Sequence, residues 1–76
     1  MNLYILNDVL YDYTSGMAVI AAESMEQCNQ IFIEEFGYGN AYSPEVIQQD
    51  FDTAVVKVIE GVDHVAGVVS YVYGGG

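Results

Sequence analysis

The stretch that decides the fold is SMEQCNQIFIEEFG, residues 24–37. Ser24 and Gln27 have the spacing of a helix-capping box, and Gly37 is a residue type that commonly ends helices. The apolar residues between these signals recur at steps of three, four and four, which is the pattern of one helix face. They are Met25, Cys28, Phe32 and Phe36. The sequence therefore predicts an amphipathic helix whose apolar stripe lies on a sheet.

Apolar, partly β-branched runs before this helix predict a first hairpin. Leu3–Leu6 begins a strand that can extend to Tyr11, a length that suits the centre of a sheet. Residues 12–16 are turn-favouring types, and Met17–Ala22 then restarts an apolar run. We therefore expect two antiparallel strands joined by a turn at residues 12–16.

The second half of the chain predicts a short helix and two more strands. Ser43–Gln49 starts with a capping serine, a proline and an acid, so we expect one short helical turn there. Thr53–Glu60 and Val68–Tyr73 predict a second hairpin around a loop. Gly74–Gly76 are expected to be frayed or a cloning remnant.

These elements predict a single α+β domain over residues 1–76, in the order β-β-α-β-β. One main helix packs on a mostly antiparallel sheet of about four strands. An apolar content of 53% allows such a small chain to fold in spite of its charge. We therefore expect a folded acidic domain with one hydrophobic core.

The charge balance is the second strong feature of the chain. Eleven acidic residues stand against one basic residue, Lys57, for a formal net charge of −10. That charge repels nucleic acid and anionic membranes, so we expect no direct contact with either and a strongly basic protein groove as the partner. Ten charges match those on roughly 17 Å of duplex DNA, or about five base pairs. Solubility alone usually needs only about 2 to 8 units.

The patterns of catalytic, metal and cofactor sites are weak. His64 is the only histidine, and it lies in a predicted loop without a triad motif. Cys28 falls on the apolar helix stripe, where a cysteine acts as a core residue, and no Cys/His cluster could hold zinc. Glu34 and Glu35 are adjacent on a helix and therefore point apart. We expect no enzymatic activity, no catalytic residue, no cofactor and no metal.

Tyrosine beside carboxylates is the interface chemistry that the acidic surface predicts. Tyrosine rings supply contact area with little loss of entropy, and carboxylates accept charge-assisted hydrogen bonds from Arg and Lys. The alternative, given equal weight, is that the loop tyrosines pack under their own loops. The predicted partner-binding residues are Glu34, Glu35, Tyr38, Tyr42, Glu45, Asp50 and Asp52.

The cysteine content and the opening segment bear on the compartment. A lone cysteine cannot form an intramolecular disulfide, which fits a reducing compartment. The opening MNLYILNDVLYDY, residues 1–13, lacks the basic region of a signal peptide, and no apolar run approaches the roughly 18 residues of a membrane span. We therefore expect a cytoplasmic protein.

Two parts of the chain resemble a loose group of small bacteriophage-encoded proteins that carry no known catalytic residue. The first part comprises NLYIL (2–6), DYT (12–14) and AVIAAES (18–24), and the second comprises VKVIEG (56–61) and GVVSY (67–71). Small size and acidity are also similar to those of phage anti-CRISPR and other anti-defence proteins, several of which occupy DNA-binding surfaces. The resemblance implies a non-enzymatic inhibitor in the bacterial host cytoplasm. Its target would be the basic DNA-binding groove of a defence nucleoprotein such as a CRISPR effector.

A homo-oligomer is the alternative from a different functional class. Exposed strand edges could pair between copies and build a structural or small-ligand-binding phage assembly, of which a homodimer is the simplest form.

Overall fold

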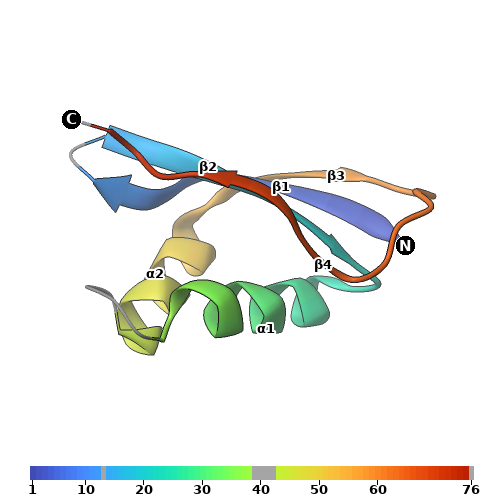
Figure 1. Ribbon diagram of the computed structural model, residues 1–76, viewed down its shortest axis with the longest axis horizontal. Coiled ribbons are helices and arrows are strands. Elements are labelled where there is room, and N and C mark those ends of the chain that lie inside the picture. The colour runs from blue at the N-terminus through green and yellow to red at the C-terminus, as the bar shows by residue number, and fades with distance from the viewer. Residues whose placement is uncertain (13, 39–42, 76) are drawn as a thin grey trace.

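The computed structural model describes residues 1–12, 14–38 and 43–75. Figure 1 shows two layers, with a twisted antiparallel sheet on one side and both helices on the other. The α+β class and the four-stranded sheet are therefore confirmed. The elements are β1 (Asn2–Asp12), β2 (Thr14–Ala22), α1 (Met25–Phe36), α2 (Pro44–Thr53), β3 (Val55–Ile59) and β4 (Gly67–Val72).

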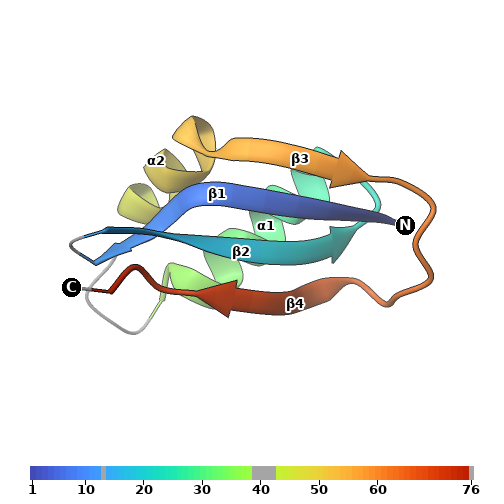
Figure 2. The same cartoon turned by 90° about the horizontal axis from the view of Figure 1, so that it is seen from above.

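The strand order across the sheet is β3-β1-β2-β4, with every neighbouring pair antiparallel. The predicted hairpin of β1 and β2 is confirmed, and its long strands occupy the centre. The predicted second hairpin is wrong, because β3 and β4 lie at opposite edges of the sheet (Figure 2). The second edge of β1 pairs with β3, and the second edge of β2 pairs with β4. The connection over residues 60–66 crosses the end of the sheet, where the Val62 N–H donates to the Met1 carbonyl at 2.9 Å.

Two predicted boundaries also differ from the structure. Residues 14–16 belong to β2 rather than to the turn. The second helix continues to Thr53 instead of stopping at Gln49, so it is a full element rather than one turn. Side-chain hydrogen bonds support its later turns, because Gln48 Nε2 donates to Asp52 Oδ1 at 2.8 Å and Thr53 Oγ1 donates to the Gln49 carbonyl at 3.0 Å.

The glycine-rich end of the chain is held in place over its described part. Gly74 N–H donates to the Leu10 carbonyl at 2.9 Å, and Gly75 N–H donates to Thr14 Oγ1 at 3.0 Å. Gly74 and Gly75 are therefore not frayed, because they close onto the β1–β2 hairpin. Gly76 lies outside the described residues.

Helix α1 begins and ends where the sequence predicts. Ser24 Oγ accepts a hydrogen bond from the Gln27 N–H at 3.1 Å, and Gln27 Oε1 accepts one from the Glu23 N–H at 2.7 Å. At the other end, the Gly37 N–H donates to the Ile33 carbonyl at 2.8 Å. These bonds satisfy backbone groups that the helix termini would otherwise leave unpaired.

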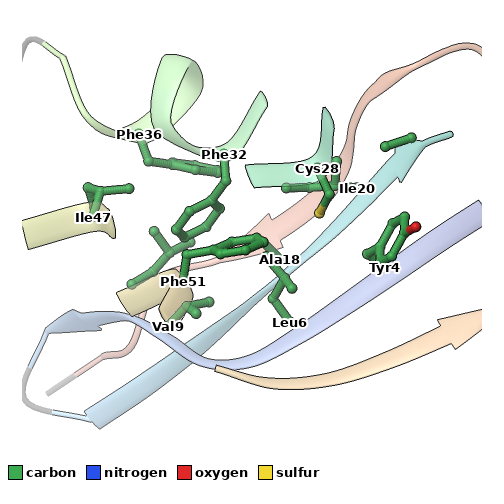
Figure 3. Close-up of a cluster of buried hydrophobic side chains, with 12 residues drawn as sticks. Tyr4, Leu6, Val9, Ala18, Ile20, Cys28, Phe32, Phe36, Ile47 and Phe51 are labelled. Atoms are coloured by element: carbon green, nitrogen blue, oxygen red, sulfur yellow. The ribbon is translucent and has the colours of Figure 1, made fainter. Parts of the chain in front are cut away.

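The core lies between the helix layer and one face of the sheet (Figure 3). Phe32 is fully buried at its centre, with its ring centroid 5.1 Å from that of Phe36 and 5.9 Å from that of Phe51. These distances are typical of favourable aromatic pairs. The core cluster comprises Tyr4, Leu6, Val9, Leu10, Ala18, Ile20, Ala22, Cys28, Phe32, Phe36, Ile47 and Phe51.

Two irregularities in β1 change which of its side chains reach the core. The pairing register shifts between Asn7 and Val9 and again between Val9 and Asp12. Asp8 and Leu10 have positive φ angles of 62° and 53°, the left-handed conformation that disfavours side chains. As a result, the consecutive residues Val9 and Leu10 are both fully buried, which a regular strand would not allow.

The left-handed conformation of Asp8 gives a stability prediction. Asp8→Gly should be more stable than Asp8→Ala by about 1 kcal/mol, because glycine adopts positive φ without the steric cost of a Cβ atom. Both variants remove the same charge, so the difference isolates backbone conformation. Urea denaturation of the two proteins measures it, and equal midpoints would contradict the assigned bulge.

Candidate functional site

The carboxylates gather on the helix layer. Helix α1 carries Glu26, Glu34 and Glu35, and helix α2 carries three more, so six of the eleven acidic residues lie there. All except Asp50 are exposed. We call these six residues the acidic layer; its members on α2 are Glu45, Asp50 and Asp52.

The opposite side of the sheet, which we call the open face, has a different composition. Three rows of four paired residues form it, each row given in the order β3, β1, β2, β4, and none of the twelve is acidic. Alternation along the strands directs these side chains away from the core. The rows are Val55, Asn7, Met17, Val72; Lys57, Ile5, Val19, Ser70; and Ile59, Leu3, Ala21, Gly67. The charge of the protein is therefore unevenly distributed between its two sides.

A shallow groove of about 370 Å³ lies on the acidic layer. Its lining combines two carboxylates, three amide side chains and two larger side chains from the helices and the residue just beyond α1. Glu26 and Glu34 are eight residues apart on α1, or about 12 Å along the helix axis. We call this the helix groove; its lining residues are Glu26, Asn29, Gln30, Ile33, Glu34, Tyr38 and Gln48.

The helix groove offers hydrogen-bond acceptors to a binding partner. Besides the two carboxylates, the buried Oδ1 atom of Asn29 has no hydrogen-bond partner among the residues that the structure describes. A buried acceptor without a donor is energetically costly. Tyr38 lies beside these acceptors with 65% of its surface exposed. The arrangement suits a planar cationic donor such as an Arg guanidinium.

The predicted contact residues fall into several places. Glu34 and Tyr38 line the helix groove, and Glu35 is exposed next to them on α1. Glu45 is exposed in the first turn of α2. The structure thus brings Glu34 and Tyr38 together, whereas Tyr42 lies outside the described residues.

The two predicted aspartates differ in their surroundings. Asp52 is exposed and accepts a hydrogen bond from Gln48 Nε2. Asp50 is half-buried, and its Oδ2 accepts a hydrogen bond from the Leu10 N–H at 3.1 Å. Burial raises the pKa of Asp50, against the lowering effect of this hydrogen bond. Asp50 therefore already has an internal partner in Leu10, one of the two residues of β1 with a positive φ angle.

The raised pKa of Asp50 predicts an unusual dependence of stability on pH. The stabilisation from neutral Asp50 is complete below the ordinary value of 3.8 and is lost as the pH rises through the folded-state pKa. We therefore expect the free energy of unfolding to rise as the pH falls from 7 toward 4. Asp50→Asn should remove part of this rise, because the amide oxygen can still accept from Leu10 but does not titrate.

Asp52→Asn is the matched control, because this aspartate is exposed on the same helix. Urea denaturation at a series of pH values should give a flatter profile for Asp50→Asn than for Asp52→Asn. Coincident profiles would show that Asp50 does not couple pH to folding.

No internal cation neutralises the acidic layer. Lys57, the only Lys or Arg of the chain, lies in the open face on the other side of the sheet. The last turns of α1 and α2 contain no basic residue, and Glu34 and Glu35 lie near the negative end of the α1 dipole. These carboxylates therefore do not stabilise their helix, and neutralising charge must come from solvent or from a partner.

The sequence predicts only some of the residues that line the helix groove. Helical spacing already predicts that Glu26, Asn29, Gln30 and Glu34 share the polar side of α1. The contribution of Gln48 depends on the packing of α2 beside α1, and no local pattern fixes that packing. The sequence likewise does not predict that the Oδ1 atom of Asn29 is buried.

Cys28 and His64, the residues considered for catalysis, do not line the helix groove. Cys28 is fully buried, and burial raises the pKa of its thiol to about 12, so the prediction of a core cysteine is confirmed. His64 is exposed in the connection between β3 and β4, as predicted. Across residues 1–12, 14–38 and 43–75, no group of three His, Cys, Asp or Glu side chains is arranged to hold a metal ion. Within the same ranges, neither helix has the length and apolar composition needed to cross a membrane.

Comparison of the chain with protein-family profiles, with curated protein sequences and with solved structures gave no match. The geometry and charge of the acidic layer are therefore the basis for a functional proposal.

Proposed function

We propose that the acidic layer binds a cationic surface of a nucleic-acid-binding protein and occupies the place of nucleic-acid phosphates. The observation that carries this proposal is the one-sided placement of six carboxylates on two helices, with the only Lys or Arg on the other side of the sheet. A basic cleft would supply the missing neutralising charge.

The dimensions of the acidic layer support this proposal. Helix α1 has 12 residues and is about 18 Å long, close to the roughly 17 Å of duplex over which DNA carries ten charges, whereas the acidic layer carries six. The carboxylates of α1 lie near both ends of that length. A groove shaped to follow a DNA backbone could therefore meet negative charge at each end of the helix.

The helix groove supports specific recognition in addition to general attraction. An Arg side chain could donate to Glu26 or Glu34, with Tyr38 as an exposed aromatic contact. Arg and Tyr are both enriched among the residues that dominate binding energy at interfaces. Tyr38 is therefore the proposed anchor, and Tyr42 remains a predicted second anchor.

The biological role that fits this binding mode is inhibition without catalysis. We infer that the protein acts in the bacterial cytoplasm as a phage-encoded inhibitor of a defence nucleoprotein, such as a CRISPR effector, by blocking access of DNA. Charge at −10 and the resemblance of the two chain segments to phage proteins support this role.

A charge-neutralisation experiment tests the proposal. The immobilised protein is used to capture partners from lysate of a bacterial host, and duplex DNA is then added as a competitor. We expect Glu26→Gln/Glu34→Gln/Glu45→Gln to weaken the captured complex by about 100-fold or more, because several charged contacts are lost together. Rising salt and added DNA should both release the partner from the wild-type protein.

The matched control removes the same charge away from the acidic layer. Asp8→Asn/Glu60→Gln/Asp63→Asn changes the hairpin and the loop after β3, and we expect a loss of affinity below about 5-fold. Equal losses for the two triple variants would show that net charge alone matters. Unchanged affinity in the helix variant would exclude the acidic layer as the binding surface.

A further inference from the structure

We propose that the open face is the interface of a homodimer in which two copies stack sheet on sheet. Antiparallel sheets with one face on a core usually present polar side chains on the other face. Here eight of the twelve open-face residues are apolar and none is acidic. The apolar residues are Leu3, Ile5, Met17, Val19, Ala21, Val55, Ile59 and Val72.

The open face is separate from the core on the helix side. Ala21 is fully buried yet does not belong to the core cluster, and Leu3, Ile5 and Val19 are only half-buried. At the edges the exposure rises to 53% for Val55 and 58% for Val72. Apolar surface patches mark interaction sites on soluble domains, and Asn7, Lys57 and Ser70 are the polar interruptions of this one.

The side of the molecule that carries the open face has room for a dimer interface. The Cα atoms span 34 × 21 × 18 Å, and Figure 1 shows the two layers stacked along the intermediate axis. The twelve open-face residues occupy roughly 200 Å² between Cα atoms, because their strands lie about 4.8 Å apart and their rows about 6.8 Å apart. The whole side measures about 610 Å² between Cα atoms, so an interface near the roughly 800 Å² per partner of the standard class also includes the strand ends around the open face.

The charge distribution of the chain indicates that a second copy of the chain binds to the open face. Two chains of charge −10 can meet at the open face because none of its twelve residues is acidic; Asp8 lies at its rim, beside Asn7, Met17 and Val72. Stacking the sheets about 10 Å apart leaves the two acidic layers on the outside, roughly 30 Å from each other. That separation exceeds the Debye length of about 8 Å at physiological salt, so repulsion between the layers is largely screened.

The sheet edges are less suited to self-association. Edge strand β3 carries Lys57 at its middle, and edge strand β4 has a register shift where it pairs with Val19 and Ile20. A lysine and a bulge are both devices that prevent a strand edge from pairing with another chain. Stacking of faces therefore replaces the edge pairing expected from the sequence as the mode of self-association.

The rows of the open face select one symmetry for the dimer. A two-fold axis parallel to the strands places β3 over the partner's β4, and β1 over the partner's β2, with the rows in register. Ile59 then faces a glycine and Leu3 faces an alanine, so large side chains meet small ones. In the middle row, Ile5 meets Val19.

The alternative two-fold axis runs across the strands and places each strand over its own copy. It brings Lys57 against the partner's Lys57, two like charges in a desolvated contact. In the selected arrangement Lys57 faces Ser70 instead, and its long stem can lie on the apolar surface while the ammonium reaches the rim. Like-charge repulsion therefore favours the axis parallel to the strands.

Sedimentation equilibrium at two salt concentrations tests the dimer. We expect twice the chain mass of 8.3 kDa, with association in 0.5 M NaCl at least as tight as in 0.15 M NaCl, because repulsion between the acidic layers is already largely screened at the lower salt concentration. The proposed binding of a cationic partner weakens with salt, so the two proposals can fail separately. A mass of 8.3 kDa at millimolar protein in 0.5 M NaCl would overturn the dimer.

A pair of matched variants tests the face. Val19→Glu places a carboxylate at the middle of the open face, and we expect it to weaken the dimer by about 100-fold or more. Gln30→Glu adds the same charge on the helix groove and should change the dimer by less than about 3-fold. Similar effects of the two variants would contradict the assigned interface.

An experiment on the wild-type chain covers the case in which Val19→Glu does not fold. Equal amounts of isotope-labelled and unlabelled protein are mixed, and contacts between copies are recorded by filtered NMR. Methyl contacts between Leu3 and Ala21 and between Ile5 and Val19 of different copies are expected. A dimer that lacks these intermolecular contacts would show that another surface forms the interface.

Discussion

Replacing Phe32 with alanine is expected to destabilise the domain by about 3–5 kcal/mol, the usual cost of removing a large side chain from a core. Phe32 is fully buried and its ring packs between those of Phe36 and Phe51, so the cavity would open at the junction of both helices. A domain of 76 residues has a total stability of about 4–11 kcal/mol. The variant should therefore lose a large part of the stability of the domain.

Circular dichroism with urea denaturation measures this effect. Phe32→Leu keeps most of the volume and should lose about 1–1.5 kcal/mol, whereas Tyr38→Ala removes an exposed ring and should change stability by less than about 0.5 kcal/mol. A Phe32→Ala protein as stable as Tyr38→Ala would contradict the assigned core.

The same core explains why the first half of the fold could be predicted. The steps between Cys28, Phe32 and Phe36 are set by helix geometry, and the structure buries all three on one face. Ser24 and Gly37 provide the expected end signals through bonds that the structure contains. These patterns are local, so a single sequence is sufficient to read them.

The errors arise where long-range pairing decides the structure. Two runs of β-branched residues separated by a short connection predict a hairpin, but the free edges of β1 and β2 were each available to one run. Local propensity does not distinguish between these pairings. The bulges of β1 were also missed, because the positive φ angles of Asp8 and Leu10 accompany register shifts against β2 that no local pattern indicates.

The candidate site follows the same division. The acidity of the chain could be predicted from its composition, and the polar side of α1 from the helical spacing of its residues. The separation between acidic layer and open face could not, because it depends on which side of the sheet the helices cover (Figure 1). The middle strand residues Ile5 and Val19 alternate with core residues in sequence, and only the packing reveals that they lie outside the core cluster and are half-buried.

Gly16→Ala is expected to detach the end of β4, with a loss of about 2–4 kcal/mol from steric overlap and broken hydrogen bonds. A Cβ atom on Gly16 would overlap the Val72 carbonyl oxygen and lie 2.8 Å from the Gly74 nitrogen. Both contacts are with backbone, which cannot turn aside as a flexible side chain can. The bond from Gly74 to Leu10 would therefore be strained or lost.

Gly75→Ala is the matched control, because a Cβ atom there meets nothing within 4 Å. Amide hydrogen exchange should show faster exchange in β4 for Gly16→Ala and unchanged rates for Gly75→Ala, and urea denaturation gives the loss of stability. Because Val72 belongs to the open face, Gly16→Ala should also weaken the proposed dimer, while Gly75→Ala should not. Slow exchange in β4 of the Gly16→Ala protein would show that β2 and β4 approach each other less closely than this geometry requires.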